Sequence, residues 1–272
     1  MSEPSTPPTD AERDAAARVF ARIALAAGQA VMDVYAGACT ARAKADSSPV
    51  TEADERAEAV ILARLAQAFP GLPVIAEESV ARGIVPLCGS RFILVDPLDG
   101  TREFLARNDE FTVNIALIDA GVPVAGVVYA PALAKLWIGG ARAWACAASP
   151  GGDLPPASAW REISARKPRA EGLVALCSRS HGDAGTEKFL AGRRIAGRVN
   201  AGSSLKFCLI AEGEADVYPR FGPTMEWDIA AGEAVLRAAG GRVLTPDGAE
   251  LRYGKAAEAF RNGFFVAWGK AA

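Results

Sequence analysis

Two aspartates follow an apolar segment closely enough to form one anionic site. Residues 96–101 read Asp-Pro-Leu-Asp-Gly-Thr and come directly after the apolar run 92–95, so a short strand would bring Asp96 and Asp99 into one small volume. Two carboxylates about 4 Å apart repel each other by roughly 4 kcal/mol at an effective dielectric near 20, a cost that a bound cation removes. Oxygen ligands favour Mg²⁺ over zinc. The six residues together predict a magnesium site, whereas a bare Asp-Gly pair would indicate only a solvated turn.

The turn after these acids predicts a contact with phosphate. Gly100 allows the backbone to approach an anion closely, and Thr101 comes next in the chain. Backbone amides at the start of a helix commonly bind phosphate groups. We therefore expect the amides of Gly100 and Thr101 to face the phosphate of a ligand.

More oxygen ligands are needed than one turn supplies, because a pair of divalent ions takes about five or six each, partly from water. Glu77 follows the apolar segment 73–76, and Asp228 lies in the first turn of a helix expected over 227–239. Taken singly, Asp228 would be a helix cap and Glu77 part of a solvated acidic pair. Together with the two aspartates of 96–101, they predict a shared cation site.

Two cations held in this way favour hydrolysis of a phosphate ester. One ion lowers the pKa of a bound water and the other neutralises the leaving oxygen. The attacking water also needs orientation and a proton acceptor, which Thr101 and Asp54 could supply as a hydroxyl–carboxylate relay. Sequence spacing alone does not show whether these two side chains meet.

Composition limits the remaining functional classes. The chain has 272 residues, is half hydrophobic and 23% charged, and has a formal net charge of −2, so it is globular and has no diffuse attraction to nucleic acid or anionic lipid. The N-terminal segment is acidic, and no apolar run approaches the roughly 20 residues that span a bilayer. We expect a cytoplasmic protein, with peripheral attachment to the inner membrane and a homodimer left open. Five widely spaced cysteines predict buried free thiols.

Hydrophobic spacing predicts two different halves. Capping-box patterns at Thr9 and Thr51 each begin an amphipathic helix, the second of which ends near 70–71. Six strands are expected next, at 74–75, 92–95, 111–118, 122–129, 136–138 and 143–146. After a connector at 148–158, strands at 173–177, 215–218, 242–244 and 264–268 alternate with helices at 185–190, 203–211 and 227–239. We predict an α+β domain over 9–147, with an antiparallel sheet and most metal ligands, and an α/β domain over 159–272, with Asp228 and the substrate contacts.

Several rival mechanisms are disfavoured. A phospho-aspartyl phosphatase has one residue between its two aspartates, whereas two residues separate them here. The only histidine is His181 and no Gly-x-Ser-x-Gly turn occurs, which argues against a serine hydrolase. Residues 263–270 have one residue too many for a Walker A loop, and no Gly-x-Gly-x-x-Gly is present.

Three segments, 74–79, 96–101 and 227–232, are similar to the three signatures of the inositol monophosphatase superfamily, in the same order. Further segments resemble its bacterial CysQ group of 3'(2'),5'-bisphosphate nucleotidases: 101–104, 111–118, 178–181, 202–207 and 218–224. The similarity covers roughly residues 10 to 270 and is weakest in the connector. One departure is Ala76, where glycine often precedes the two acids.

The resemblance implies a layered αβαβα sandwich of the inositol monophosphatase and fructose-1,6-bisphosphatase type, with the site between the halves. It implies two or three Mg²⁺ ions per site, lithium sensitivity and a place in sulfur metabolism. Its metal ligands would be Glu77, Asp96, Asp99, Asp228 and the main-chain oxygen of Leu98, and its catalytic residues Asp54, Thr101 and Glu77. The residues that bind the substrate would be Gly100, Thr101, Ser178, His181, Gly202, Ser203, Lys206 and Arg220.

Basic residues favour a substrate with two phosphates. Lys206 and Arg220, with Lys44 and Arg179 as further candidates, could meet a second phosphate, each desolvated contact contributing roughly 1.5 to 3 kcal/mol. For each of them a solvated surface charge is the alternative. We predict removal of the 3'-phosphate of adenosine 3',5'-bisphosphate to give AMP. Hydrolysis of inositol monophosphate or a sugar bisphosphate, and a non-catalytic Mg²⁺-dependent sensor of phosphate esters, remain the alternatives.

Overall fold

The computed structural model describes residues 6–37, 42–43, 49–178 and 184–271. The helices are α1 (Asp10–Tyr35), α2 (Glu52–Ala68), α3 (Glu77–Ala81), α4 (Thr101–Leu105), α5 (Ala184–Ala191), α6 (Leu205–Ala211) and α7 (Glu226–Ala238), with 3-10 helices η1 (Ala157–Ala159) and η2 (Ala256–Glu258). The first strands are β1 (Arg42–Ala43), β2 (Pro49–Val50), β3 (Val74–Ala76), β4 (Arg91–Asp99), β5 (Thr112–Asp119), β6 (Val122–Ala130), β7 (Lys135–Gly139), β8 (Ala143–Ala147) and β9 (Arg161–Ile163). The later strands are β10 (Leu173–Ser178), β11 (Ile195–Ala201), β12 (Val217–Arg220), β13 (Thr224–Met225), β14 (Arg242–Leu244), β15 (Arg261–Asn262) and β16 (Phe265–Trp268).

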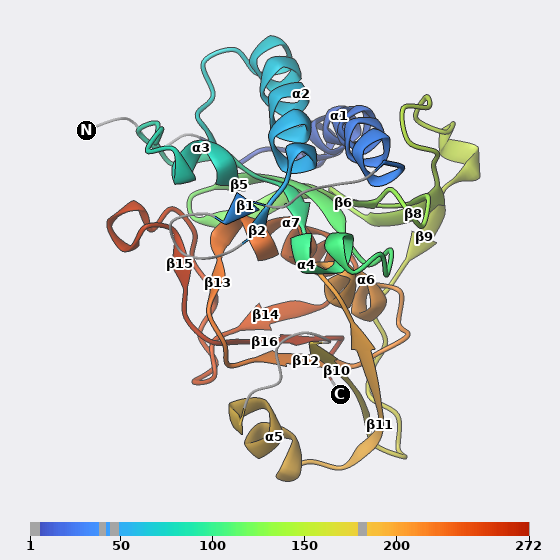
Figure 1. The fold of residues 1–272 in the computed structure, drawn as a ribbon. Helices are drawn as coiled ribbons and strands as arrows, with labels where there is room; N and C mark the ends of the chain where they lie inside the picture. Colours follow the sequence, from blue (N-terminus) through green and yellow to red (C-terminus); the bar gives the residue numbers. More distant parts are fainter. Residues whose placement is uncertain (1–5, 38–41, 44–48, 179–183, 272) are drawn as a thin grey trace.

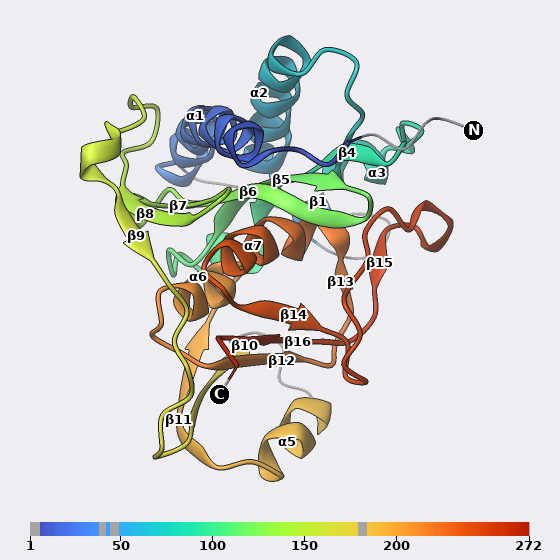
Figure 2. The same ribbon diagram turned by 180° about the vertical axis from the view of Figure 1, so that it is seen from behind.

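These elements form five layers (Figures 1 and 2). Helices α1 and α2 cover one face of a seven-stranded sheet, α6 and α7 lie between that sheet and a five-stranded sheet, and α5 lies on the far side of the second sheet. The predicted αβαβα arrangement is confirmed.

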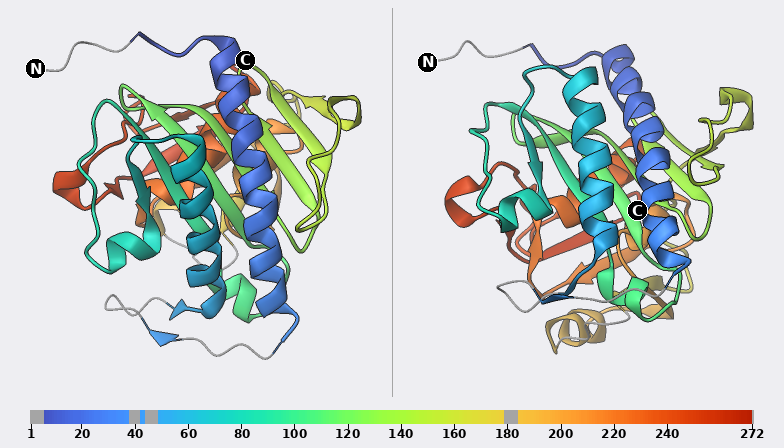
Figure 3. Two further views of the ribbon diagram at one scale, coloured as in Figure 1. Left: turned by 90° about the horizontal axis from the view of Figure 1, so that it is seen from above. Right: turned by 45° about the horizontal axis from the view of Figure 1, so that its top comes forward.

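Both predicted capping boxes are present. At the start of α1, the Thr9 hydroxyl accepts a hydrogen bond from the amide of Glu12, and the Glu12 side chain accepts one from the amide of Thr9. Thr51 and Asp54 make the same reciprocal arrangement at the start of α2. Figure 3 shows α1 and α2 side by side across the large sheet. Because each cap satisfies amides that lack an intrahelical partner, both helices begin where the sequence predicts.

Helix α1 corrects one expectation from the sequence. Its length and composition would allow it to cross a membrane, although no sufficiently long apolar run was expected. Its apolar residues, including Phe20, Leu25 and Val31, are buried in one cluster with residues of α2, β5 and β6. They pack as in the core helix of a globular protein, and such a helix passes the same length and composition test.

The large sheet has the order β3-β4-β5-β6-β7-β8-β9. Strands β3 and β4 run parallel, and each later neighbour is antiparallel. Strand β9 pairs with β8 although it follows the connector, so this sheet extends beyond the predicted boundary at 148–158. The division into domains 9–147 and 159–272 stays a prediction.

Helix α7 packs closely against β7 of the large sheet and against α6, because a glycine lies at each of these contacts. A Cβ atom on Gly139 of β7 would lie 2.7 Å from the Cα of Val235 in α7. A Cβ atom on Gly232 of α7 would lie 2.5 Å from the Phe207 ring of α6. Any larger residue at either position would therefore push apart the layers that bring Asp228 to the site.

The small sheet has the order β11-β10-β12-β16-β14, with β10 parallel to both of its neighbours. The predicted strands and helices of this half are present. In the described part of the chain as a whole, strands β1, β2, β9, β11, β13 and β15 and helices α3 and α4 were not expected. Of the cysteines in the described part of the chain, Cys146 and Cys208 are buried free thiols, as predicted, whereas Cys88 and Cys177 are only partly buried, contrary to the prediction.

Candidate active site

The ends of three strands meet the starts of four helices around one cavity. Strands β4, β10 and β12 end there and helices α3, α4, α6 and α7 begin there, around a volume of about 260 Å³. Nine of the predicted site residues line it: Glu77, Asp99, Gly100, Thr101, Ser178, Ser203, Lys206, Arg220 and Asp228. Residues from both halves of the chain, more than 100 positions apart, therefore share one site.

A β-bulge brings the two central aspartates to the same side of β4. Asp96 pairs with Asn114 and Asp99 with Thr112, so three steps along β4 match two steps along β5. In a regular strand, residues three apart face opposite sides of the sheet, and one extra residue reverses that relation. Pro97 lies within this bulge, where a missing amide hydrogen costs no ladder bond.

Glu77, Asp96, Asp99 and Asp228, called here the acidic cluster, influence one another strongly. Burial and the charges of the other three members raise the pKa of Asp96 well above its usual value. Burial and the charges of Asp99 and Glu77 do the same for the pKa of Asp228, although the amide of Met225 donates a hydrogen bond to it at 2.8 Å. Four carboxylates are thus concentrated in one place, and Asp96 and Asp228 ionise less easily than ordinary aspartates.

The pKa of Asp99 is raised less than those of Asp96 and Asp228, because a cation lies near it. Burial raises its pKa to about 6, while the charge of Lys206 opposes the shift and the charge of Glu103 adds to it. Asn114 donates a hydrogen bond to Asp99 at 3.4 Å. This carboxylate therefore joins the acidic cluster to the basic residues of the cavity.

The acidic cluster fits a divalent cation in its chemistry. All its donors are carboxylate oxygens, which Mg²⁺ prefers, and a cation would offset their mutual repulsion. Within residues 6–37, 42–43, 49–178 and 184–271, no three His, Cys, Asp or Glu side chains are placed as a preformed metal site. The donor set and its repulsion thus fit a cation, although the side chains are not arranged as a finished cage.

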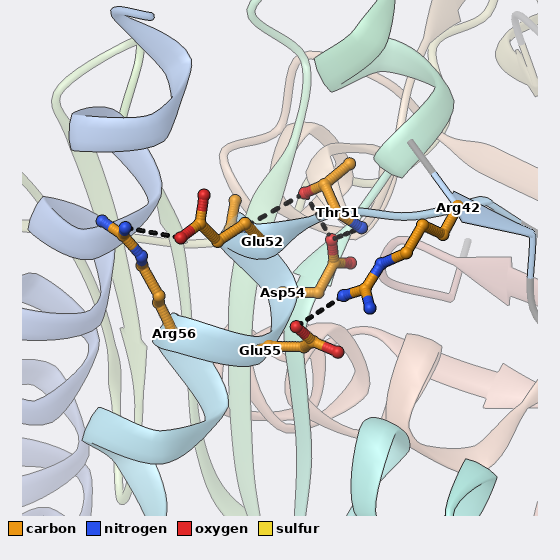
Figure 4. Close-up of polar contacts among 7 residues, drawn as sticks. Arg42, Thr51, Glu52, Asp54, Glu55 and Arg56 are labelled. Carbon is orange, nitrogen blue, oxygen red and sulfur yellow. Dashed lines mark hydrogen bonds and ion pairs between the residues drawn. The ribbon is translucent and has the colours of Figure 1, made fainter. Parts of the chain in front are cut away.

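The two side chains of the predicted relay, Thr101 and Asp54, contact each other. The Thr101 hydroxyl lies 3.3 Å from Asp54 Oδ1 and 3.4 Å from the carbonyl oxygen of Leu98, either of which can accept its hydrogen. Figure 4 shows Asp54 turned toward Thr51, whose amide and hydroxyl donate to Asp54 Oδ2 at 2.8 and 2.7 Å. The cap that starts α2 therefore also fixes the carboxylate that reaches Thr101.

Lys206 and Arg220, called here the basic pair, also line the cavity. Their positive charges are opposite to the negative charges of the acidic cluster. Both side chains are buried. Lys206 donates hydrogen bonds to the carbonyl oxygens of Ser203 at 2.7 Å and Ala201 at 3.1 Å, and its ammonium lies 5.1 Å from the centre of the Tyr218 ring. Burial lowers the pKa of Lys206 to about 8, with Arg220 acting in the same direction and Asp99 opposing it.

The loop before α6 is shaped by Gly202 and Ser203. A Cβ atom on Gly202 would lie 2.8 Å from Glu103 Cγ and from the carbonyl oxygen of Glu110, so only glycine fits there. Its amide donates to Glu110 at 2.8 Å, and Gly202 is not part of the cavity lining. Ser203 has a φ of 42°, in the left-handed region that non-glycine residues rarely adopt, and the residue lines the cavity.

Three buried polar atoms of the lining have no hydrogen-bond partner among the described residues. They are the Ser203 hydroxyl, the Thr224 hydroxyl and the Nε of Arg220. Buried polar groups are nearly always satisfied, so such groups on a cavity wall indicate a polar ligand. Thr224 was not predicted as a site residue, although it ends the segment 218–224 that resembles the CysQ group, and that segment was the available signal.

Other residues of the site also went unpredicted. Arg102 and Glu103 of α4 line the cavity, and their position directly after 96–101 was the available signal. Ser204 links two layers, since its hydroxyl donates to the carbonyl oxygen of Asp228 at 2.6 Å and accepts from Asn114 at 3.1 Å. These contacts join residues far apart in the chain, which spacing does not reveal.

The remaining predicted residues lie beside the lining or outside the described part. Asp54, Asp96 and Leu98 are buried behind the cavity surface, and the amide of Leu98 donates to Asp96 at 3.0 Å. His181, Arg179 and Lys44 lie outside the described residues.

Comparison with known proteins agrees with this arrangement. The sequence profile of the inositol monophosphatase family matches residues 12–268. A protein of Escherichia coli O157:H7 named 3'(2'),5'-bisphosphate nucleotidase CysQ is 44% identical over 235 residues, covering 85% of this chain and 91% of the relative. A CysQ from Buchnera aphidicola is 38% identical over 240 residues, covering 85% of each chain.

Solved structures agree as well. The crystal structure of CysQ from Bacteroides thetaiotaomicron, described as a bacterial member of the inositol monophosphatase family, superposes with a TM-score of 0.79. It is 37% identical, covering 94% of this chain and 98% of that one. An inositol monophosphatase from Anabaena shares the fold at 24% identity, with a TM-score of 0.70 and coverage of 94% and 91%.

Proposed function

The chain belongs to the inositol monophosphatase family, and from that premise we propose that it is a Mg²⁺-dependent phosphomonoesterase that removes the 3'-phosphate of adenosine 3',5'-bisphosphate. The products are AMP and phosphate. The observation that carries this proposal is the similarity to CysQ nucleotidases, which extends over nearly the whole length of both chains and includes a structural neighbour. The enzyme is thus a hydrolase for a small phosphate ester.

The charge distribution of the cavity supports a substrate with two phosphates. The acidic cluster lies at one part of the lining, where a divalent cation can bind the phosphate that reacts. The basic pair lines the same cavity, where Lys206 and Arg220 can bind an anion that does not react. A substrate with a single phosphate, such as an inositol monophosphate, would leave the basic pair without its anion.

The acidic cluster and the main-chain oxygen of Leu98 would hold two or three Mg²⁺ ions. When bound, these ions supply a water of lowered pKa and neutralise the leaving oxygen. The bulge in β4 holds Asp96 and Asp99 on one side of the strand, and α7 brings Asp228 to them from the later half of the chain. Glu77 enters from the start of α3.

Asp54 and Thr101 orient and deprotonate the attacking water. The Thr101 hydroxyl can donate to Asp54 while its oxygen accepts from a water in the cavity, so a proton can pass to the buried carboxylate. Both hydrogen bonds from Thr51 keep Asp54 Oδ2 occupied and leave Oδ1 toward Thr101. The cap of α2 therefore selects which carboxylate oxygen takes part.

The substrate is bound by groups on both sides of the reacting phosphate. Gly100 has a φ of 94° and begins α4, so the amides at this turn can face a phosphate oxygen. Ser178, Ser203, Lys206 and Arg220 also line the cavity and would hold the nucleoside and the 5'-phosphate. His181 and Gly202 are assigned to the same role by their place in the sequence motifs.

We propose a cytoplasmic location, with peripheral attachment to the inner membrane and a homodimer as open alternatives. A flotation assay with inner-membrane vesicles and light scattering of the purified protein would decide between these states.

A phosphate-release assay tests the function. Adenosine 3',5'-bisphosphate, inositol 1-phosphate and fructose 1,6-bisphosphate are compared at equal concentration, each with Mg²⁺ and with EDTA. We expect the highest initial rate on the nucleotide and no release with EDTA. A faster rate on inositol 1-phosphate would overturn the substrate, and tight nucleotide binding without turnover would indicate a sensor.

A further inference from the structure

Helix α3 begins with amides that its own segment does not cap. The first four amides of any helix lack an intrahelical partner, and the residue before α3 is Ala76, which has no side-chain acceptor. Glu58, from the middle of α2, supplies the missing acceptor. Its Oε2 accepts hydrogen bonds from the amides of Glu78 at 2.8 Å and Ser79 at 3.3 Å.

The second oxygen of Glu58 binds the same short segment. Glu58 Oε1 accepts from the Ser79 hydroxyl at 2.8 Å and from a guanidinium nitrogen of Arg82 at 2.7 Å. The Glu58 side chain is 1% exposed, whereas that of Arg82 is 49% exposed. All four donors come from residues 78–82, so the buried carboxylate is bound entirely to α3 and the residue that ends it.

Helix α2 therefore holds two separate parts of the site from one face. Asp54 and Glu58 are four residues apart and both buried, as side chains on the same side of a helix are. Asp54 contacts Thr101 at the start of α4, and Glu58 contacts the start of α3. Exposed positions of α2 carry ordinary surface ion pairs instead, including Glu55 with Arg42 at 2.7 Å (Figure 4).

The position of Glu77 depends on this contact. Glu77 is the first residue of α3 and directly precedes the two amides that Glu58 holds. Its side chain lines the cavity, and its charge contributes to the raised pKa of Asp96. Releasing these amides would free the first turn of α3 and, with it, the carboxylate that reaches into the acidic cluster.

We propose that Glu58 is a positioning residue that fixes Glu77 and thereby sets the affinity of the site for divalent cations. This inference rests on the proposed function, in which Glu77 is a metal ligand. Groups that orient metal ligands commonly change metal affinity or activity by 10- to 100-fold when they are removed. Glu58 would act without touching metal or substrate.

The test compares Glu58→Gln with Glu55→Gln, which removes the same charge from the exposed side of the same helix. Mn²⁺ binding is measured by titration calorimetry, and the Mg²⁺ concentration for half-maximal rate is measured with adenosine 3',5'-bisphosphate. We expect Glu58→Gln to weaken Mn²⁺ binding and raise the Mg²⁺ requirement by about 10- to 100-fold. Its rate should recover largely in excess Mg²⁺, and Glu55→Gln should match the wild type.

A purely structural role would lower the melting temperature of Glu58→Gln without changing Mn²⁺ affinity, and that result would overturn the inference. If Glu58→Gln does not fold, Ser79→Ala and Arg82→Gln each remove a single donor to Glu58. Weaker Mn²⁺ binding by either variant supports the inference, and wild-type binding by both overturns it. A wild-type protein that binds no Mn²⁺ would instead refute the proposed metal-dependent function, and the inference with it.

Discussion

The acidic cluster and the basic pair face the same cavity, but the protein balances their charges to different degrees. Burial and mutual repulsion raise the pKa values of Asp96 and Asp228, and among the described residues the charge of Arg220 offsets only part of the effect on Asp228. Lys206, in contrast, donates to two main-chain carbonyl oxygens and lies near Asp99. The acidic cluster thus depends on an added cation, whereas the basic pair is largely held in place before any ligand arrives.

The largest expected effect comes from removing a central charge of the acidic cluster. Asp99→Asn keeps the shape of the side chain but removes one carboxylate that a cation would bind. We expect turnover to fall by orders of magnitude while the far-ultraviolet circular dichroism stays unchanged. Initial rates across a Mg²⁺ series measure this, and a wild-type rate at saturating Mg²⁺ would remove Asp99 from the ligand set.

The next effect tests the relay at the edge of the acidic cluster. Asp54→Asn leaves the cluster intact but removes the proton acceptor next to Thr101. General base catalysis is typically worth about 10²- to 10⁴-fold, so kcat should fall by that order. The affinity for Mn²⁺ should change little, because Asp54 is not in the cluster. An equal loss of kcat and of metal binding would indicate that Asp54 is a ligand.

The acidic cluster was easier to predict from the sequence than the contacts that support it. Asp96 and Asp99 follow an apolar strand, and both capping boxes are local patterns within four residues. Helix α3 was missed because its cap is Glu58, which is 20 residues away from Glu78. Strand β11 was missed because it lies at the sheet edge and most of its residues are not buried, so it lacks the apolar alternation of a core strand.

The basic pair was harder to predict than the acidic cluster, because each of its two members is a single residue without a characteristic pattern around it. Lys206 and Arg220 were found through motif similarity, and nothing in their immediate surroundings indicates that both are buried. Thr224 was missed altogether. A basic residue is usually solvated, so only the fold distinguishes a buried lysine that faces a cavity from one at the surface.

A third prediction tests the basic pair directly. Lys206→Met keeps most of the volume of the buried side chain and removes its charge. If Lys206 binds the phosphate that does not react, KM for adenosine 3',5'-bisphosphate should rise by about 10- to 100-fold, as expected for a desolvated charge-assisted contact. KM for a monophosphate substrate, measured in parallel, should change far less. Equal effects on both substrates would show that Lys206 does not discriminate between them.

A fourth prediction concerns stability in EDTA, where the repulsion in the acidic cluster is not offset. Asp99 has a pKa of about 6 in the folded protein, against an ordinary value of 3.8. Between these values the folded state binds more protons than the unfolded state, so its stability falls as the pH rises from about 4 to 6 and stays lower above that. Asp99→Asn should therefore melt at a higher temperature than the wild type at pH 7.5, and the difference should shrink toward pH 4. Calorimetric melting curves across this range measure it, and a constant difference would contradict the burial of an uncompensated charge.

The smallest expected effect comes from a neutral group beside the basic pair. Thr224 lines the cavity, and its buried hydroxyl has no partner among the described residues. In Thr224→Val that unsatisfied group is replaced by a methyl of similar size, so the ligand-free protein should become slightly more stable. If the hydroxyl binds substrate, KM should rise by a few-fold, as expected for a neutral hydrogen bond of about 1 kcal/mol. Thr224→Ser keeps the hydroxyl and should keep the wild-type KM. An unchanged KM in the valine variant would confine recognition to the charged groups, and the cavity would then select its substrate by charge alone.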